Sequence, residues 1–152
     1  MTVMISPNPD KQLADVIAVR AAQILLNHGS HVLMREELQA SCNTMGVSYL
    51  PEKECLQQAD IILTIGGDGT ILHEANLTLE YKKPILGVNL GRCGFLATCE
   101  VDEMETKLAA VARGEYSLDS RMLLYARVLG EDNWKGHALN AVSYTHLTLP
   151  TK

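Results

Sequence analysis

The chain has 152 residues, of which 47% are hydrophobic and 20% are charged, and its formal net charge is -5. This length accommodates one complete domain, or one domain and the beginning of another, and the composition is that of a globular protein with an apolar core. The acidic balance disfavours nucleic acid and anionic membranes as partners, whereas small phosphorylated ligands remain compatible with it.

The sequence gives no sign of export or membrane insertion. The amino terminus has no basic segment leading into an apolar stretch, and roughly 18 apolar residues never occur in one run. We therefore expect a cytoplasmic protein. The cysteines lack Cys-x-x-Cys spacing and the density of a secreted disulfide scaffold, which favours reduced thiols. They are Cys42, Cys55, Cys93 and Cys99.

The chain begins with the pattern of a strand, a turn and an amphipathic helix. Thr2–Ser6 is a short apolar run that stops at Pro7-Asn8-Pro9. Asp10 is placed to cap a helix after this turn, and Gly29 is placed to end it. The apolar positions of this predicted helix include Leu13, Val16, Ile17, Ile24 and Leu25.

The alternation of strands and helices continues through the middle of the chain. His31–Met34 is a second strand candidate, followed by a polar stretch over Ala40–Gly46. Asp60–Ile65 is almost continuously aliphatic, which is typical of a central parallel strand buried on both faces. Ile71–Tyr81 predicts a helix and Ile85–Asn89 a further buried strand.

The character of the chain changes after the last predicted helix, Asp102–Arg113. Met122–Leu129 and Trp134–Asn140 read as two strands of a hairpin. We therefore expect an α/β domain with an open, mainly parallel sheet at residues 1–116, followed at 117–141 by the truncated start of a β-rich domain.

Gly66-Gly67-Asp68-Gly69-Thr70 lies between a predicted strand and a predicted helix. At such a junction, backbone N–H groups and the positive helix end can receive phosphate oxygens. A tight turn would explain the glycines by itself, but it would not explain Asp68. A carboxylate among phosphates is unfavourable unless it binds a metal or removes a proton. The motif therefore predicts phosphoryl transfer to a hydroxyl, with Asp68 as the catalytic residue.

A second glycine-containing turn, Gly87–Leu96, follows the next predicted strand. In an open α/β sheet both turns would lie at the same carboxyl edge and face one crevice. Phe95 can stack on a base and Arg92 can meet a phosphate. Alone, however, a Phe beside a turn is more often a core anchor and a lone Arg is usually solvated.

His73 is one turn into the predicted helix, close enough to Asp68 to touch a ligand. A partly buried helix histidine is an equally good interpretation. His73-Glu74 does not indicate a zinc protease site, because Leu77 stands where the second histidine would be required.

Taken together, the motifs closely resemble those of bacterial NAD kinases over about residues 1–141. The segments that carry this resemblance are Pro7–Pro9, Ile65–Thr70, Gly87–Ala97 and Ala138–Asn140. The Gly-Gly-Asp-Gly-Thr element also occurs in diacylglycerol and sphingosine kinases and has a relative in phosphofructokinases. The Gly-Phe-Leu and Ala-Leu-Asn segments single out NAD kinases, and a sheet of the NAD kinase/phosphofructokinase type is implied.

The resemblance implies transfer of a phosphoryl group from ATP, or from polyphosphate in some members, to the 2′-hydroxyl of the adenosine ribose of NAD. NADP is the product, and a divalent metal, normally Mg²⁺, is required. Asp68 matches the proton acceptor of the family, Gly66, Gly67, Gly69 and Thr70 line the phosphate and NAD crevice with it, and Phe95 lies beside the dinucleotide. Asn140 matches a residue that holds the NAD ribose, and the full-length parent is implied to be a homo-oligomer.

Two other functions use the same glycine turns. A lipid kinase of the diacylglycerol type is disfavoured by the Gly-Phe-Leu segment and by the lack of a basic or amphipathic membrane-binding feature. A non-catalytic nucleotide-binding module would bind nucleotide without turnover, so replacement of Asp68 discriminates it from a kinase.

The resemblance ends abruptly after Asn140. The family follows this asparagine with Glu or Asp, whereas this sequence has Ala141, and residues 142–152 resemble nothing in the family. The codons GTC TCT TAT ACA CAT CTG ACG CTG CCG ACG encode Val142–Thr151 and resemble the end of a transposase-type library adapter. That adapter begins with CT, so a Glu or Asp codon interrupted after its first G becomes GCT, which encodes Ala141.

We therefore predict that residues 142–152 are a non-native tail and that the 152-residue fragment is itself poorly soluble and inactive. Independent resequencing of the source DNA tests directly whether residues 142–152 are native. A native gene that encodes Ser143–Lys152 in frame contradicts the interpretation, as does NAD phosphorylation by this chain alone.

Overall fold

The computed structural model describes residues 1–91, 94–127 and 135–139. The chain divides into two compact units, Met1–Leu118 and Asp119–Lys152. No helix in the described ranges is long and apolar enough to cross a membrane.

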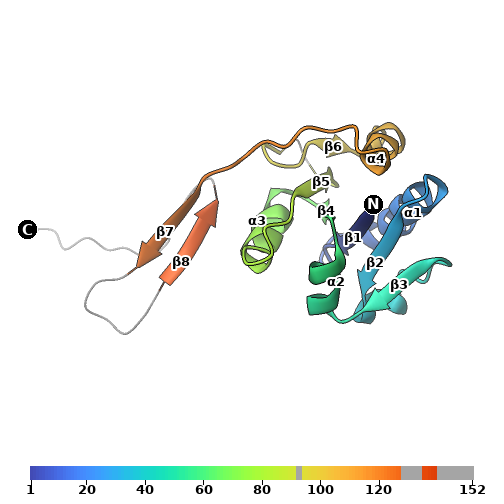
Figure 1. Cartoon of the computed structure of the whole chain (residues 1–152), viewed down its shortest axis with the longest axis horizontal. Helices are drawn as coiled ribbons and strands as arrows, with labels where there is room; N and C mark the ends of the chain where they lie inside the picture. Colours follow the sequence, from blue (N-terminus) through green and yellow to red (C-terminus); the bar gives the residue numbers. More distant parts are fainter. Residues whose placement is uncertain (92–93, 128–134, 140–152) are drawn as a thin grey trace, which may run out of the picture. The chain divides into compact units, whose positions relative to one another are not determined.

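The first unit is built on a six-stranded sheet in which every strand pair is parallel. Its strand order is β3-β2-β1-β4-β5-β6 (Figure 1). The strands are β1 Thr2–Pro7, β2 His31–Arg35, β3 Val47–Leu50, β4 Ile61–Gly66, β5 Ile85–Asn89 and β6 Cys99–Glu100. The predicted open, mainly parallel α/β sheet is therefore confirmed.

Helices cover both faces of this sheet. They are α1 Ala14–Asn27, α2 Glu52–Gln58, α3 Asp68–Leu77, α4 Met104–Ala112 and the short 3-10 helix η1 Glu36–Gln39. On one face, α1 and α4 pack with Val3 and Ile5 of β1, whereas Met4 points to the opposite face and packs with α2. Ser6 follows the same alternation as Met4 and contacts α3. The helices α2 and α3 therefore share the second face.

The central strand β4 is buried along its whole length. It pairs with β1 on one side, where Val3 is opposite Ile61, and with β5 on the other, where Ile62 is opposite Ile85. This is the arrangement that its almost continuous aliphatic sequence predicts, because helices remove both of its faces from water.

The start of α1 differs from the prediction. Asp10 does not cap the helix; its amide donates to Oδ1 of Asn8 at 3.0 Å, and α1 begins after Leu13, which has a left-handed φ of 67°. Val16, predicted on the apolar face, is 62% exposed. The helix instead presents small side chains that allow close packing on the sheet. Its buried residues are Ala14, Ala18, Ala21, Ala22, Ile24 and Leu25.

The boundaries of α3 also differ from the prediction. The helix begins at Asp68 rather than at Ile71, and it ends at Leu77 rather than at Tyr81. Asp68, Gly69 and Thr70 therefore form the first helical turn, after Gly66 ends β4 and Gly67 caps the helix. The sequence pattern also missed β3, α2, η1 and β6, because β3, η1 and β6 have only two to four residues and the seven residues of α2 are too few to display a helical period.

The second unit contains an antiparallel pair, β7 Leu123–Arg127 and β8 Lys135–Leu139. Leu123 lies opposite Leu139, and the rings of Tyr125 and His137 are 5.1 Å apart between centroids. The predicted hairpin pairing is confirmed for these residues. The predicted turn after Leu129, Asn140 and the tail at 142–152 lie outside the described residues.

Candidate functional site

The strand order of the sheet reverses between β1 and β4. From β1 the chain moves outward to β2 and β3, and it then returns to β4 on the other side of β1. In open α/β sheets, ligands bind at the carboxyl ends of the strands at such a switch point. The glycine motif follows β4, and the Pro7-Asn8-Pro9 turn follows β1, so both predicted turns lie at this edge.

Asn8 joins the two turns. Its amide donates to the carbonyl oxygen of Ile65 at 2.9 Å, and its side-chain Nδ2 donates to Oγ1 of Thr70 at 3.0 Å. Thr70 Oγ1 also accepts a long bond of 3.4 Å from the amide of Gly67, the residue that precedes α3. The Asn-Pro turn therefore borders the glycine motif.

The carboxylate of Asp68 binds the second glycine turn. Its Oδ2 accepts the amide of Phe95 at 2.8 Å, and its Oδ1 accepts the amides of Leu96 and Ala97 at 3.0 and 3.1 Å. Since an ionised carboxylate has about four lone-pair directions, these bonds leave roughly one for a ligand. The two predicted turns are thus brought together through the residue that the sequence singled out.

These hydrogen bonds favour the charged form of Asp68. The bond from Phe95 is the largest cause that lowers the pKa of this carboxyl below its ordinary value. Burial opposes it as the next largest cause, and the bonds from Ala97 and Leu96 add to the lowering. The carboxylate is therefore fully ionised at neutral pH. The hydrogen-bonded carboxylate raises the free energy of unfolding at pH values above the ordinary pKa of Asp. This contribution is lost as the pH falls through the lowered pKa of Asp68.

Three glycines at the site are required by close packing. A Cβ atom at Gly94 would lie 2.3 Å from Oδ1 of Asp68, and one at Gly66 would lie 2.2 Å from Oγ1 of Thr70. A Cβ atom at Gly87 would meet the side chain of Ile71 at 2.4 Å. None of these distances is sterically possible without movement, so these glycines serve the fold.

Gly67 and Gly69 differ from the other glycines of the site. Among the described residues, a Cβ atom at either position would have nothing within 4 Å, and neither residue has a positive φ. A tight turn therefore does not explain them. The space beside both residues is open at the amino-terminal end of α3, where a helix attracts anions.

The structure places the two aromatic candidates at the surface. Phe95 is 89% exposed, so it is not a core anchor, and its ring stands next to the amide that binds Asp68. His73 is exposed on α3 and is spaced three and four residues from Thr70 and Gly69, which puts all three on one helix face. Arg92 and Asn140 lie outside the described residues.

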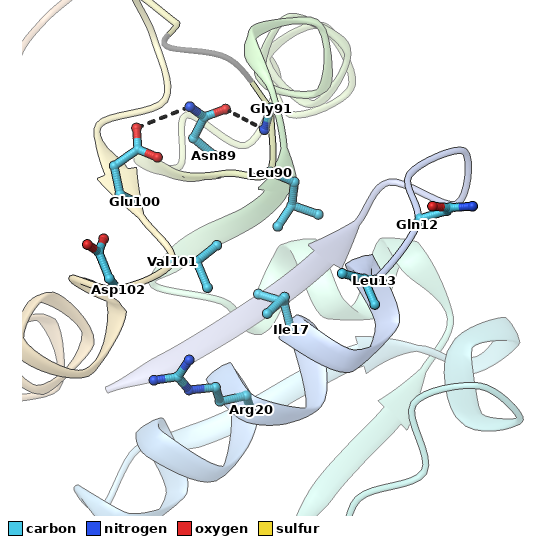
Figure 2. Close-up of a pocket in the computed structure, with 10 residues that line it drawn as sticks. All are labelled: Gln12, Leu13, Ile17, Arg20, Asn89, Leu90, Gly91, Glu100, Val101 and Asp102. Carbon is cyan, nitrogen blue, oxygen red and sulfur yellow. Dashed lines mark hydrogen bonds between the residues drawn. The ribbon is translucent and has the colours of Figure 1, made fainter.

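A groove of about 550 Å³ lies between the amino-terminal part of α1 and the ends of β5 and β6 (Figure 2). Its lining residues are Gln12, Leu13, Ile17, Arg20, Asn89, Leu90, Gly91, Glu100, Val101 and Asp102. Asn89, the last residue of β5, donates to Oε1 of Glu100 at 3.1 Å and accepts the amide of Gly91 at 3.1 Å. The sequence interpretation did not single out Asn89, although a polar residue that ends an aliphatic strand was a usable signal.

Residues 3–116 match the family model described as the ATP-NAD kinase N-terminal domain. The NAD kinase of Azotobacter vinelandii is 35% identical over 133 residues, which cover 86% of this chain and 45% of the relative. The NAD kinase of Methanopyrus kandleri is 35% identical over 130 residues, covering 84% and 44%. The chain thus spans about half the length of the curated relatives it matches.

One solved structure supports the fold. Yeast NADH kinase complexed with NADH superposes with a TM-score of 0.75 over 91% of this chain and 46% of that chain, at 20% sequence identity. At this identity the likeness shows the fold alone.

Alanine substitutions should distinguish the glycines that close packing requires from those with open space beside them. Gly94→Ala is expected to lower the free energy of unfolding by about 1–3 kcal/mol, because its Cβ collides with Asp68. Gly69→Ala is expected to raise it by about 0.5–1 kcal/mol, because the residue lies in a helix with open space beside it. Urea denaturation measures both, and equal effects of the two substitutions would contradict this division.

Proposed function

The chain belongs to the ATP-NAD kinase family, and from this premise we propose that the complete protein transfers a phosphoryl group from ATP to the 2′-hydroxyl of the adenosine ribose of NAD. NADP is the product. The observation that carries the proposal is the placement of Asp68. It is an ionised carboxylate at the start of α3, at the switch point of the sheet, with an unused lone-pair direction and open glycine backbone beside it.

The open glycines support a phosphate ligand. Gly69 is a poor helix former, and nothing in the fold prevents a side chain at its position or at that of Gly67. Because these two glycines carry no side chain, an incoming phosphate can reach backbone N–H groups at the positive end of α3. We propose that Gly66 and Thr70 form the base of this phosphate site, because they contact each other and Asn8.

Asp68 is proposed to accept the proton of the ribose hydroxyl as the new P–O bond forms. Its lowered pKa makes it a weak base, so its main contributions are to orient the hydroxyl and to receive the proton once phosphorus has made that hydroxyl acidic. Phosphoryl transfer depends mainly on such positioning and on charge compensation.

We propose that Mg²⁺ arrives with the ATP phosphates and offsets their charge. Mg²⁺ usually keeps several waters and binds one or two carboxylates together with substrate phosphates, so it needs no dedicated protein cage. The described residues offer no group of His, Cys, Asp and Glu that would form such a cage, and they include Asp68 at the phosphate site. These residues therefore fit a metal that is shared with the substrate. ATP and polyphosphate remain alternative donors.

Two exposed side chains are proposed to contact the dinucleotide. Phe95 offers a free ring beside the Asp68 carboxylate, where it can stack on a base. His73 shares a helix face with Gly69 and can reach a ligand bound over that residue. Asn140 is proposed to hold the NAD ribose, on the resemblance alone.

The resemblance also supports proposals about the complete protein. We propose a cytoplasmic homo-oligomer in which residues 1–116 form the domain that carries Asp68. Residues 117–141 would begin the β-rich domain that completes the NAD site, and 142–152 would be non-native.

The first test is a product assay on the complete protein. Incubation with NAD, ATP and Mg²⁺ should yield NADP, identified by mass spectrometry as a phosphate on the adenosine ribose. Diacylglycerol in place of NAD is expected to remain unmodified. Phosphorylation of the lipid with NAD left intact would replace the proposed function by that of a lipid kinase.

The second test removes the proton acceptor. Asp68→Asn is expected to lower kcat by roughly 10²–10⁴-fold, with a much smaller change in the Kd of ATP measured by calorimetry. Glu37→Gln is the control, because it also removes one carboxylate charge but lies on η1 and is exposed. Near-normal turnover of Asp68→Asn would remove Asp68 from the mechanism. Unchanged ATP binding in a wild-type protein without turnover would indicate a non-catalytic nucleotide-binding module.

A further inference from the structure

The helix that carries Asp68 has little apolar attachment to the sheet. Of the ten residues of α3, all of which the structure describes, Ile71 and Glu74 are the buried ones. Glu74 is 2% exposed, an unusual position for a carboxylate on a helix that lies at the surface of a domain. The apolar contact at Ile71 fits against Gly87 of β5. Glu74 supplies a buried polar contact from α3 to β1 and β2.

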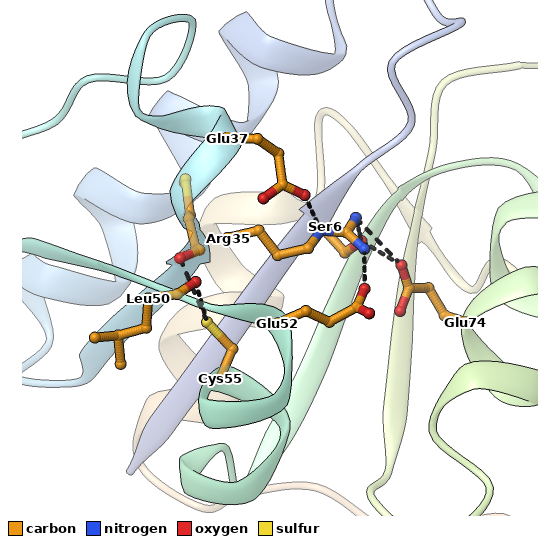
Figure 3. A network of polar contacts seen from close by, with 8 residues as sticks. Ser6, Arg35, Glu37, Leu50, Glu52, Cys55 and Glu74 are labelled. Carbon is orange, nitrogen blue, oxygen red and sulfur yellow. Dashed lines mark hydrogen bonds and ion pairs between the residues drawn. The ribbon is translucent and has the colours of Figure 1, made fainter.

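Glu74 is held by two residues from neighbouring strands (Figure 3). The hydroxyl of Ser6, near the end of β1, donates to Oε1 of Glu74 in a short hydrogen bond. The guanidinium of Arg35, the last residue of β2, lies 3.5 Å from the same oxygen and donates to Oγ of Ser6 at 2.8 Å. We call Ser6, Arg35 and Glu74 the α3 clamp.

The clamp is reinforced from outside by two further carboxylates. Arg35 donates to Oε1 of Glu52 at the start of α2 at 2.7 Å, and its Nε lies 3.4 Å from Oε1 of Glu37. Their side chains are 43% and 64% exposed, and among the described residues neither forms a hydrogen bond or ion pair with α3. They hold Arg35 in place, whereas Glu74 alone transmits that constraint to α3.

A buried carboxylate fixes geometry more strictly than an apolar contact does. Water is excluded at Glu74, so its charge is tolerated only while Arg35 and Ser6 stay within hydrogen-bonding distance. An apolar side chain could slide along the sheet at little cost, but Glu74 cannot do so without losing both partners. Since a helix rises about 1.5 Å per residue, Glu74 fixes α3 about 9 Å from Asp68. The intervening segment is a continuous helix.

We propose that Glu74, held by Arg35 and Ser6, is a positioning residue for phosphoryl transfer: it sets the placement of α3 and thereby aims Asp68 at the Phe95–Ala97 amides and at the bound hydroxyl. The proposal rests on the proposed kinase function for its catalytic consequence. Its structural consequence, the placement of Asp68 against the second glycine turn, can be measured without catalysis.

The experiment compares Glu74→Gln with Glu37→Gln in the complete protein. Both substitutions remove one carboxylate from Arg35 and preserve side-chain size, but Glu74 lies on α3 and Glu37 does not. Residue-resolved hydrogen exchange reports on the amides of Phe95, Leu96 and Ala97. In Glu74→Gln these amides should exchange at least about 10-fold faster, and in Glu37→Gln they should exchange as in the wild type.

Kinetics supply the second readout. Glu74→Gln is expected to lower kcat for NAD phosphorylation roughly 10- to 100-fold, as a small displacement of a reacting group does, with the KM values for NAD and ATP within about twofold. Glu37→Gln should retain wild-type kinetics. If Glu74→Gln does not fold, Ser6→Ala replaces it, because it removes the hydroxyl that links Arg35 to Glu74 and should shift both readouts in the same direction by a smaller factor.

Two results would overturn the proposal. One is that Glu74→Gln, or its replacement, matches Glu37→Gln in exchange and in kcat. The other is an exchange increase spread evenly over residues 1–118, which would mean general loss of stability rather than displacement of α3. If the wild-type protein does not phosphorylate NAD, the proposed function fails, while the exchange comparison still decides whether the clamp positions Asp68.

Discussion

The interaction on which the site depends is the set of three amide hydrogen bonds that the Asp68 carboxylate accepts from Phe95, Leu96 and Ala97. It joins the start of α3 to the connection between β5 and β6, two segments that are separated by the whole of helix α3 and strand β5. The charge is favoured where it stands, because Asp68 lies in the first turn of α3, at the positive end of the helix. The bonds also require that Gly94 carry no side chain. One carboxylate thus connects the start of α3 to Phe95, Leu96 and Ala97.

The same bonds constrain the chemistry that the site can perform. Amide donors that hold a carboxylate also stabilise its charged form, so they lower its pKa and its strength as a base. For phosphoryl transfer this is a small disadvantage, since the barrier depends chiefly on alignment and on charge compensation. A rigidly held, weakly basic Asp68 suits that reaction better than it would suit proton abstraction from carbon. The proposed function and the observed geometry are therefore compatible for a stated physical reason.

The two faces of the sheet differ in what their contacts do: one contributes stability, and the other places helix α3. Beneath α1 the contacts are apolar and tightly packed, with alanines against Val3 and Ile5, and this face supplies a large part of the core. Beneath α3 the carboxyl ends of β1 and β2 carry Ser6 and Arg35, and a buried Glu74 contacts both. Polar contacts of this kind contribute less net stability than apolar packing, but they define one geometry. The functional helix lies on the face where geometry is set by hydrogen bonds.

The sequence by itself determined the parallel α/β class and the buried central strand, and it singled out Asp68. These follow from local patterns: an aliphatic run at Asp60–Ile65, glycines at a strand-to-helix junction and a carboxylate that a turn does not need. It also predicted that the two glycine-containing turns share an edge, because parallel strands end on one side of a sheet. Short elements such as β3 and α2 escaped it, since a few residues cannot show a period.

Only the tertiary structure decided which glycines are required by close packing, where α1 begins and which residues Glu74 contacts. Gly94 and Gly69 look alike in sequence, and they differ only in whether a distant carboxylate occupies the space where a Cβ would stand. Leu13 and Val16 have the spacing of a buried face, yet the sheet selects the alanines because close packing favours small side chains there. Glu74 meets Ser6 and Arg35 across 68 and 39 positions of the chain, respectively. Contacts between residues so far apart leave no local pattern in the sequence, and they exist only once the strands have been placed side by side.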